Sequence, residues 1–305
     1  MTYPLEGVAP LPHLGVIRAQ GEDAASFLHG QLTQDFALLK PGHARLAAFC
    51  SAKGRMQASF IGVLLGPQDI ALVMSRDLLA PTLKRLSLFV LRAKVKLTDA
   101  CEAWILRGLA GQAAATADGQ TLAPWADHVQ GDSHRIGLYP CEGIPRALWV
   151  APAGSPEPAG PALDSMLWQW SEVRSGVATV SAPVLEAFVP QMLNYESVGG
   201  VNFKKGCYPG QEVVARSQFR GTLKRRATLA HADSPLQAGM EIFHTEDPSQ
   251  PCGLVAQAAP APDGGWDAIV SLQTSAMEGG ALHAQAPDGP ALSLRPLPYP
   301  LLADV

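Results

Sequence analysis

Apolar and polar positions along the first half of the chain follow periods that are typical of strands and helices in turn. Six apolar runs have the length and composition of β-strands. They cover residues 14–19, 44–50, 56–65, 70–74, 93–97 and 147–151. The residues between the second and third runs, 51–54, contain a lysine and a glycine and predict a hairpin turn.

Three segments show helical spacing of their apolar residues. The first follows the acidic pair Glu22 and Asp23, which favours a helix start through the helix dipole, and Gly30 is expected to cap its end. Asp77 is expected to open the second helix. The apolar positions of the second and third helices are Leu79, Leu83, Leu86 and Val90, and Leu163, Met166, Leu167 and Trp170.

The amino-acid composition of the rest of the chain changes at two places. Repeated prolines at residues 152–161 predict a linker, since proline removes backbone donors and is excluded from helix interiors. From about Leu223 short strands alternate with glycine, proline and Asp-Gly turns, a pattern that suits a small β-barrel or sandwich. We therefore predict a first region over residues 1–222, which the linker can divide into two subdomains, and a barrel over residues 223–305.

Composition narrows the protein class. The chain has 305 residues, 47% of them hydrophobic and 16% charged, which is enough apolar material for two or three packed domains. The longest apolar stretch, residues 83–95, is interrupted by four basic residues, so no membrane span is expected. The N-terminus lacks the pattern of a secretory signal, and this predicts a cytoplasmic protein. Eight histidines without metal-ligand spacing predict no permanently bound metal.

Cys207 is the cysteine whose surroundings favour chemistry. The five cysteines are widely spaced, without a CxxC pair, so neither a disulfide framework nor a zinc knuckle is expected. Four lie in apolar, strand-like contexts typical of inert thiols. Cys207 instead follows Lys204, Lys205 and Gly206 and precedes Tyr208-Pro209-Gly210-Gln211, whose Pro-Gly pair predicts a type II turn. A short helix or strand is expected over residues 211–218, and Glu212 in a first helical turn favours the helix. Nearby lysines and a helix N-terminus both stabilise a thiolate.

The segment from residue 204 to 226 concentrates positive charge in a chain of net charge −4. It holds seven basic residues and one acidic residue, Glu212. Such a patch can bind a phosphate backbone or the carboxylates of a small molecule, and it can equally be a solvated basic face. Aromatic residues among these charges are few, which gives little support to a single-strand stacking platform.

The cysteine segment resembles the signature of the YgfZ family, a K-G-C-x-x-G-Q-E pattern, over residues 203–216 and on to 219–221. Residues 27–35, 51–55, 188–191, 194, 199–200 and 296–299 are similar to other blocks of that family, so the resemblance covers essentially the whole chain. The family belongs to the superfamily of the T-protein of the glycine cleavage system, an aminomethyltransferase that uses tetrahydrofolate. The resemblance therefore implies an α+β fold with a folate-binding body and a small C-terminal β-barrel.

The same resemblance implies which residues act. Cys207 would be the reactive group, in contact with a transient iron–sulphur cluster or catalytic itself. Lys205, Arg216 and Arg220 would hold the carboxylate tail of a folate or orient the thiolate. The other implied folate contacts are Trp168, Leu14, Tyr208, Gln211, Glu212, Gln191 and Asn194. Because Trp168 and Trp170 lie two residues apart on a helix, they cannot share a face, and Trp168 is the one assigned to the cleft.

Three departures from the superfamily pattern stand in this sequence. The aminomethyltransferases have a related Lys-Gly turn without a cysteine in it, and Cys207 argues against simple T-protein activity. The segment Glu172-Val173-Arg174-Ser175-Gly176 matches an Arg-x-Glu-x-Gly pattern with its two charges exchanged. Leu14 stands where the family has an aromatic folate contact, and an apolar side chain there can still pack on a ring.

Function then divides into three hypotheses. The resemblance implies an accessory factor, rather than a turnover enzyme, that binds tetrahydrofolate or a related folate and serves iron–sulphur enzymes or assembly proteins. Its clients would include radical enzymes that thiolate tRNA. The alternatives are a tetrahydrofolate-dependent aminomethyltransferase and a non-enzymatic protein whose basic patch makes weak tRNA contacts.

Overall fold

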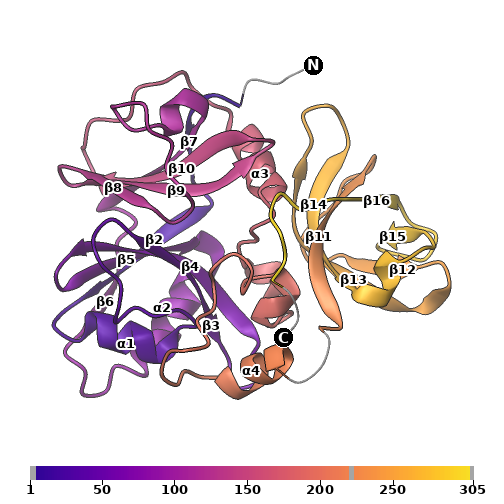
Figure 1. Cartoon of the computed structure of the whole chain (residues 1–305), viewed down its shortest axis with the longest axis horizontal. Coiled ribbons are helices and arrows are strands. Elements are labelled where there is room, and N and C mark those ends of the chain that lie inside the picture. The colour runs from indigo at the N-terminus through magenta and orange to yellow at the C-terminus, as the bar shows by residue number, and fades with distance from the viewer. Residues whose placement is uncertain (1–4, 220–222, 303–305) are drawn as a thin grey trace.

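The computed structural model describes residues 5–219 and 223–302, and in this part of the chain the strands form two sheets and a barrel (Figure 1). One five-stranded sheet has the order β3-β4-β5-β2-β6, and the other has the order β1-β7-β10-β9-β8. Strands β11-β14-β13-β12-β15-β16 close the barrel. Every pairing between named strands is antiparallel.

The bounds of the elements are as follows. The first sheet consists of β2 (Leu14–Gln20), β3 (Ala44–Cys50), β4 (Met56–Gly66), β5 (Asp69–Ser75) and β6 (Lys96–Asp99). The second consists of β1 (Gly7–Pro10), β7 (Trp104–Ala110), β8 (Asp127–Gln130), β9 (Ser133–Cys141) and β10 (Ile144–Pro152). The barrel strands are β11 (Arg225–Ala232), β12 (Glu241–His244), β13 (Asp247–Pro260), β14 (Trp266–Gln273), β15 (Leu282–Ala284) and β16 (Ala291–Arg295). The α-helices are α1 (Ala24–Gln31), α2 (Leu79–Ser87), α3 (Ser165–Arg174) and α4 (Gln211–Phe219), and short 3₁₀ turns include η4 (Pro190–Leu193).

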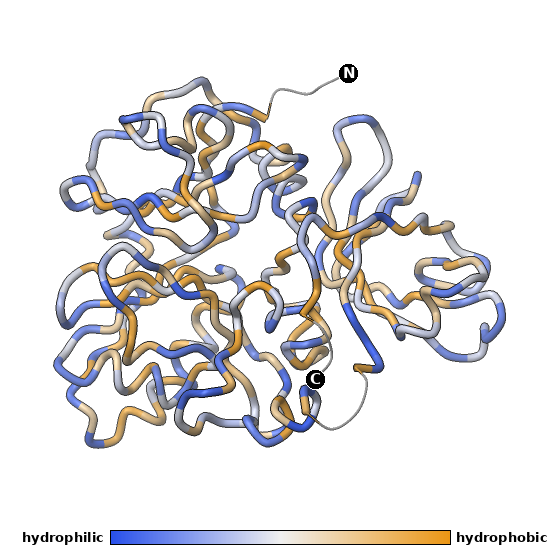
Figure 2. The backbone as a smooth tube through the Cα atoms, in the orientation of Figure 1, coloured by the Kyte–Doolittle hydropathy of each residue, from blue (hydrophilic) through white to orange (hydrophobic). Residues whose placement is uncertain are grey.

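Strands β2, β3, β4 and β5 of the first sheet are buried on both faces, which explains why their sequences are nearly continuous apolar runs. Ile17 and Leu72 pack into a core shared with α1, α2 and the segment around residues 178–201, whereas their neighbours Val16 and Val73 pack against the second sheet. Successive side chains of a strand point to opposite faces, so both must be apolar when both faces are covered. Figure 2 shows such hydrophobic stretches along the strands of the body.

Most predicted strands and the hairpin are confirmed. The turn after β3 is closed by hydrogen bonds from Gly54 N to Ser51 O, 2.9 Å, and from Ser51 N to Arg55 O, 2.8 Å. The closed C-terminal barrel agrees with the expected strand-rich region after Leu223, while the boundary proposed at residue 222 stays a prediction. Among the described residues, no helix combines the length and apolarity needed to cross a bilayer.

The helix predictions need three corrections. Gly30 lies inside α1, whose cap is Leu32, and α2 ends at Ser87, so Val90 follows it. On α3 the buried residues are Trp168, Ser171 and Val173, whereas Met166 is 55% exposed. The predicted face was incomplete: Leu163, Leu167 and Trp170 do pack against core residues, but α3 is wedged between the second sheet and strands β13 and β14 of the barrel (Figure 1), so its buried positions do not form one stripe.

Candidate functional site

The Cys207 segment lies against the β3–β4 hairpin. Gly210 has φ +79°, as the third position of a type II turn requires, and Gln211 N donates a hydrogen bond to Tyr208 O at 3.2 Å. A Cβ atom at Gly210 would come within 2.4 Å of Ser51 O and 2.7 Å of Gly54 Cα. The predicted turn is therefore confirmed, and only glycine allows its backbone to approach the hairpin so closely.

Lys205 fastens the other end of this segment. Its side chain is buried, and Nζ donates to Leu32 O at 2.8 Å and to His29 O, two carbonyls at the C-terminal end of α1. Nζ also lies 4.6 Å from the ring centroid of Tyr208. Burial lowers the pKa of Lys205 to about 8, although the nearby charges of Asp35 and Cys207 oppose that shift. Lys205 therefore points into the protein and ties the segment to α1.

Cys207 is exposed between these two attachments, and the residue before it, Gly206, lies beside a histidine–aspartate pair. His29 Nδ1 lies 2.9 Å from Asp35 Oδ1, and His29 Nε2 lies 3.3 Å from where a Cβ at Gly206 would stand. Burial opposes ionisation of Asp35, but hydrogen bonds from Leu38 N and His29 and the charge of Lys205 leave its pKa lowered. Nothing in the sequence pattern singles out this pair, because its members come together only where α1 ends.

Helix α4 begins directly after the turn, as predicted. Glu212 and Arg216 form an ion pair of 2.6 Å across one turn of its surface, with side chains 82% and 60% exposed. Exposed pairs of this kind contribute little stability, so both side chains remain available to a ligand. Gln211 is the first residue of the helix and is half-buried. Arg220 lies outside the described residues.

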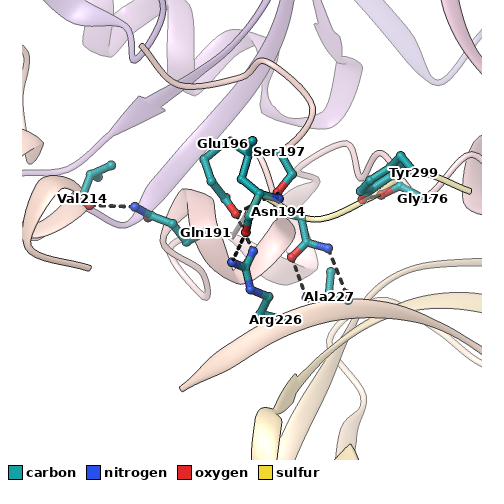
Figure 3. A network of polar contacts seen from close by, with 10 residues as sticks. Gly176, Gln191, Asn194, Glu196, Ser197, Val214, Arg226, Ala227 and Tyr299 are labelled. Carbon is teal, nitrogen blue, oxygen red and sulfur yellow. Dashed lines mark hydrogen bonds and ion pairs between the residues drawn. The ribbon is translucent and has the colours of Figure 1, made fainter. Parts of the chain in front are cut away.

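Gln191 and Asn194 lie in the interior and connect the body to α4 and the barrel (Figure 3). Gln191 Nε2 donates to Val214 O at 2.7 Å. Asn194 Nδ2 donates to Ala227 O at 2.9 Å, and Ala227 N donates back to Asn194 Oδ1 at 3.3 Å. The side-chain amides of Gln191 and Asn194 therefore attach α4 and β11 to the body, which is a structural role independent of any ligand.

Leu14 and Trp168 line a pocket between the two sheets, apart from the cysteine segment. None of the residues from 204 to 219 lines it. Its walls are mostly apolar and aromatic, and its cavity is about 60 Å³. Trp168 is 1% exposed, and a Cβ at Gly108 would stand 2.4 Å from its ring, so the ring lies directly on the β7 backbone. The other aromatic side chains that line the pocket, which the sequence did not assign to it, are Phe60, Trp125, Tyr139 and Tyr195.

Two opposite charges face this pocket. Glu172 Oε1 accepts a hydrogen bond of 2.8 Å from Trp168 Nε1, and His13 Nε2 lies 3.1 Å from both carboxylate oxygens. Burial disfavours the charged form of His13, but the hydrogen bond and charge of Glu172 outweigh it and raise the pKa of His13.

Arg146 supplies the positive charge of the pocket. Its guanidinium lies 4.4 Å from the ring centroid of Trp168, and its buried Nε has no hydrogen-bond partner among the described residues. Burial lowers the pKa of Arg146, opposed by the charge of Glu172. Arg146 and His13 were missed because nothing in the local sequence separates them from ordinary surface residues.

Glu172 and Arg174, the two residues whose charges are exchanged relative to the superfamily pattern, have different surroundings. Glu172 lines the pocket, whereas Arg174 Nε donates to Glu142 Oε1 at 2.8 Å and Arg174 Nη1 lies 3.8 Å from Asp267 Oδ2. A carboxylate is thus present in the pocket although Arg174 occupies the acidic position of the superfamily pattern. Across residues 5–219 and 223–302, no group of three or more His, Cys, Asp or Glu side chains could hold a metal ion.

Comparison with known proteins agrees with this architecture. No family model matches the chain. It is 30% identical over 297 residues to the tRNA-modifying protein YgfZ of Sodalis glossinidius, covering 93% of this chain and 90% of that protein. The YgfZ proteins of Edwardsiella ictaluri and Escherichia coli O157:H7 are 29% and 28% identical, with 93% and 92% of this chain and 89% of each relative covered.

A solved structure shows the same fold. The crystal structure of glycine cleavage system aminomethyltransferase T from Bartonella henselae superposes with a TM-score of 0.65 at 19% identity, covering 98% of this chain and 90% of that one. The predicted fold, a T-protein-like body with mixed helices and strands and a C-terminal barrel, is confirmed.

Proposed function

Because this chain belongs to the YgfZ family of tRNA-modifying proteins, we propose that it is a folate-binding factor that supports tRNA modification through iron–sulphur enzymes, with Cys207 as its reactive group. The observation that carries the proposal is the arrangement of the cysteine segment. Lys205 and Gly210 fix its two ends to α1 and to the β3–β4 hairpin, and Cys207 stands exposed between them. A thiol held this way meets a partner protein or cluster without a change in the fold.

The pocket beside Trp168 supports the folate part of the proposal. The donor-rich edge of a pterin ring suits a carboxylate, and Glu172 supplies one. The unpartnered Nε of Arg146 is a buried donor that a ligand carbonyl would satisfy. Trp168 and Leu14 would pack on the ring faces, and a bound tetrahydrofolate would supply a carrier for one-carbon groups.

The small size of the pocket means that it must widen before a pterin can bind. A cavity of about 60 Å³ holds a few water molecules and is smaller than the engineered cavity of about 150 Å³ that accepts benzene. The residues of the pocket fit a pterin in their chemistry, and its entry would require the lining side chains to move apart. Trp125 and Trp168 line the cavity, so binding should change tryptophan fluorescence.

The cysteine is tested by functional replacement. A strain lacking its own copy of this factor should regain iron–sulphur enzyme activity and thiolated tRNA with the wild-type gene but not with Cys207→Ala. Cys252→Ala serves as the matched control, because Cys252 is buried in the barrel away from this segment. Full rescue by Cys207→Ala, with normal folding, would remove the cysteine from the mechanism.

Folate binding is tested separately on the purified protein. Titration with tetrahydrofolate under anaerobic conditions should give saturable fluorescence quenching in wild type and in Cys207→Ala, and at least tenfold weaker binding in Glu172→Gln, about the loss of one charge-assisted hydrogen bond. Equal affinity of wild type and Glu172→Gln would show that the folate, if bound, does not use this pocket.

A further inference from the structure

A cleft between the body and the barrel carries two arginines and lies outside both sites described above. It measures about 260 Å³. Its walls come from the hairpin residue Arg55, from the segment around Ala187 and Met192, and from barrel strands that include Arg225 and Ser271. Arg225 begins β11, whose first residues form a hydrophilic stretch in Figure 2.

Both guanidinium groups are anchored in ways that leave most of their donors free. Arg55 Nη1 donates to Ala187 O at 2.6 Å and lies 4.0 Å from Met192 Sδ. Arg225 Nη1 donates to Cys252 O at 2.8 Å. A guanidinium has five N–H donors, so each keeps several for another partner. Within the described residues neither arginine forms an ion pair with a carboxylate.

The two positive charges affect each other. The pKa of Arg225 is lowered, first by burial and also by the charge of Arg55, against an opposing effect of Cys252. Two like charges in one partly buried cleft cost free energy unless an anion compensates them. Glu241 lines the cleft as well, but it is exposed and makes no ion pair with either arginine among the described residues.

Ser271 supplies an independent indication of a ligand. Its side chain is 1% exposed and lines the cleft, and its Oγ has no hydrogen-bond partner among the described residues. A buried hydroxyl without a partner costs free energy that a bound acceptor would recover. The hydroxyl and the two guanidinium groups are all donors, so the ligand that fits them is an acceptor-rich anion.

We propose that Arg55, Arg225 and Ser271 form a binding site for a phosphate group. A free phosphate or phosphate monoester carries about −1.5 to −2 charges at neutral pH and offers several acceptor oxygens, which balances two arginines better than one carboxylate does. The group could belong to a small phosphate compound or to a nucleic-acid backbone, whose phosphodiester carries one negative charge and offers acceptor oxygens to the same three side chains. The site does not depend on folate binding or on Cys207.

The test measures inorganic phosphate binding to the full-length protein by calorimetry at low ionic strength. Wild type should bind saturably, and Arg55→Gln and Arg225→Gln should each weaken binding by about tenfold or more, the loss expected for charge-assisted hydrogen bonds. Ser271→Ala should weaken it less, and Glu241→Gln should strengthen it. Arg85→Gln removes one exposed positive charge on α2 and should leave the affinity within about twofold.

The source of the phosphate is distinguished by competition. A short single-stranded RNA that displaces phosphate from wild type, and loses affinity in Arg55→Gln, assigns the site to a nucleic-acid backbone; an RNA that does not compete assigns it to a small phosphate compound. Arg55→Lys and Arg225→Lys keep the charge without the guanidinium fork, so they serve where a glutamine variant fails to fold. No saturable phosphate binding by wild type, or unchanged affinity in folded variants of both arginines, would overturn the proposal.

Discussion

Trp170 Nε1 donates a hydrogen bond of 2.8 Å to Asp267 Oδ2, and this contact joins α3 of the body to β14 of the barrel. The other oxygen of Asp267 lies 2.8 Å from His231 Nδ1, so one buried carboxylate serves both sides of the junction. Trp170 thus helps to hold the barrel against α3, whereas Trp168, two positions earlier on the helix, faces the pocket.

The first prediction concerns this carboxylate. Asp267→Ala should lower the free energy of unfolding by about 3 kcal/mol, because Trp170 and His231 lose a buried charged partner together. Chemical denaturation at neutral pH measures the loss. Asp233→Ala is the control: Asp233 is fully exposed and 3.8 Å from His231 Nε2, so its change should stay within about 0.5 kcal/mol. Similar losses in both variants would contradict the role assigned to Asp267.

Gly210 provides a second prediction. Gly210→Ala should destabilise the protein by about 2 kcal/mol more than Gly131→Ala and should change the rate at which Cys207 reacts with a thiol reagent. Both glycines have positive φ, +79° and +60°, but a Cβ at Gly131 meets nothing within 4 Å. The comparison therefore separates the cost of the left-handed backbone from the clash with Ser51. Equal melting temperatures of the two variants would show that the hairpin yields to the added methyl group.

Lys205 gives a pH-dependent prediction. Its pKa is about 8 in the folded protein and about 10.4 in an unfolded chain, so between these values the unfolded state binds more protons. Its contribution to stability therefore rises with pH from about 8 to 10. The stability of wild type relative to Lys205→Met should increase by about 2 kcal/mol across this window, measured by denaturation at several pH values. A difference that stays flat, or falls, would rule out the buried ammonium described here.

His13 gives the fourth prediction. Glu172 raises its pKa against the effect of burial, so Glu172→Gln should move that pKa downward, to below its ordinary value of about 6.5, because burial then acts without the charge. The imidazole proton signals of His13, followed by NMR across pH, report this directly. His43 provides an internal reference, since it lies outside the pocket. An unchanged titration of His13 would mean that Glu172 is not its partner in solution.

Several local features follow from the sequence because neighbouring residues decide them. The Pro209-Gly210 turn, the hairpin at residues 51–54 and the start of α4 at Gln211 all match the patterns that predict them. Strands β2, β3, β4 and β5 of the first sheet are also predicted, since residues buried on both faces must be apolar whatever they pack against. Strand β6, which is half-buried to exposed, begins at Lys96 rather than at residue 93. The buried positions of α3 were predictable only in part, because strands β1, β9, β13 and β14 all contact this helix.

For the candidate sites, too, sequence and tertiary structure each determined a different part. Sequence alone determined a cysteine in a turn beside lysines, and the resemblance of its motif determined the family. Tertiary structure decided that the ammonium of Lys205 donates hydrogen bonds to carbonyls at the end of α1. It also decided that Trp168 and Leu14 line a pocket with Glu172 and Arg146, away from Cys207. The physical reason is distance along the chain: Lys205 meets Leu32, and Leu14 meets Trp168, across long stretches of sequence, and only the packing of sheets and helices brings such segments together.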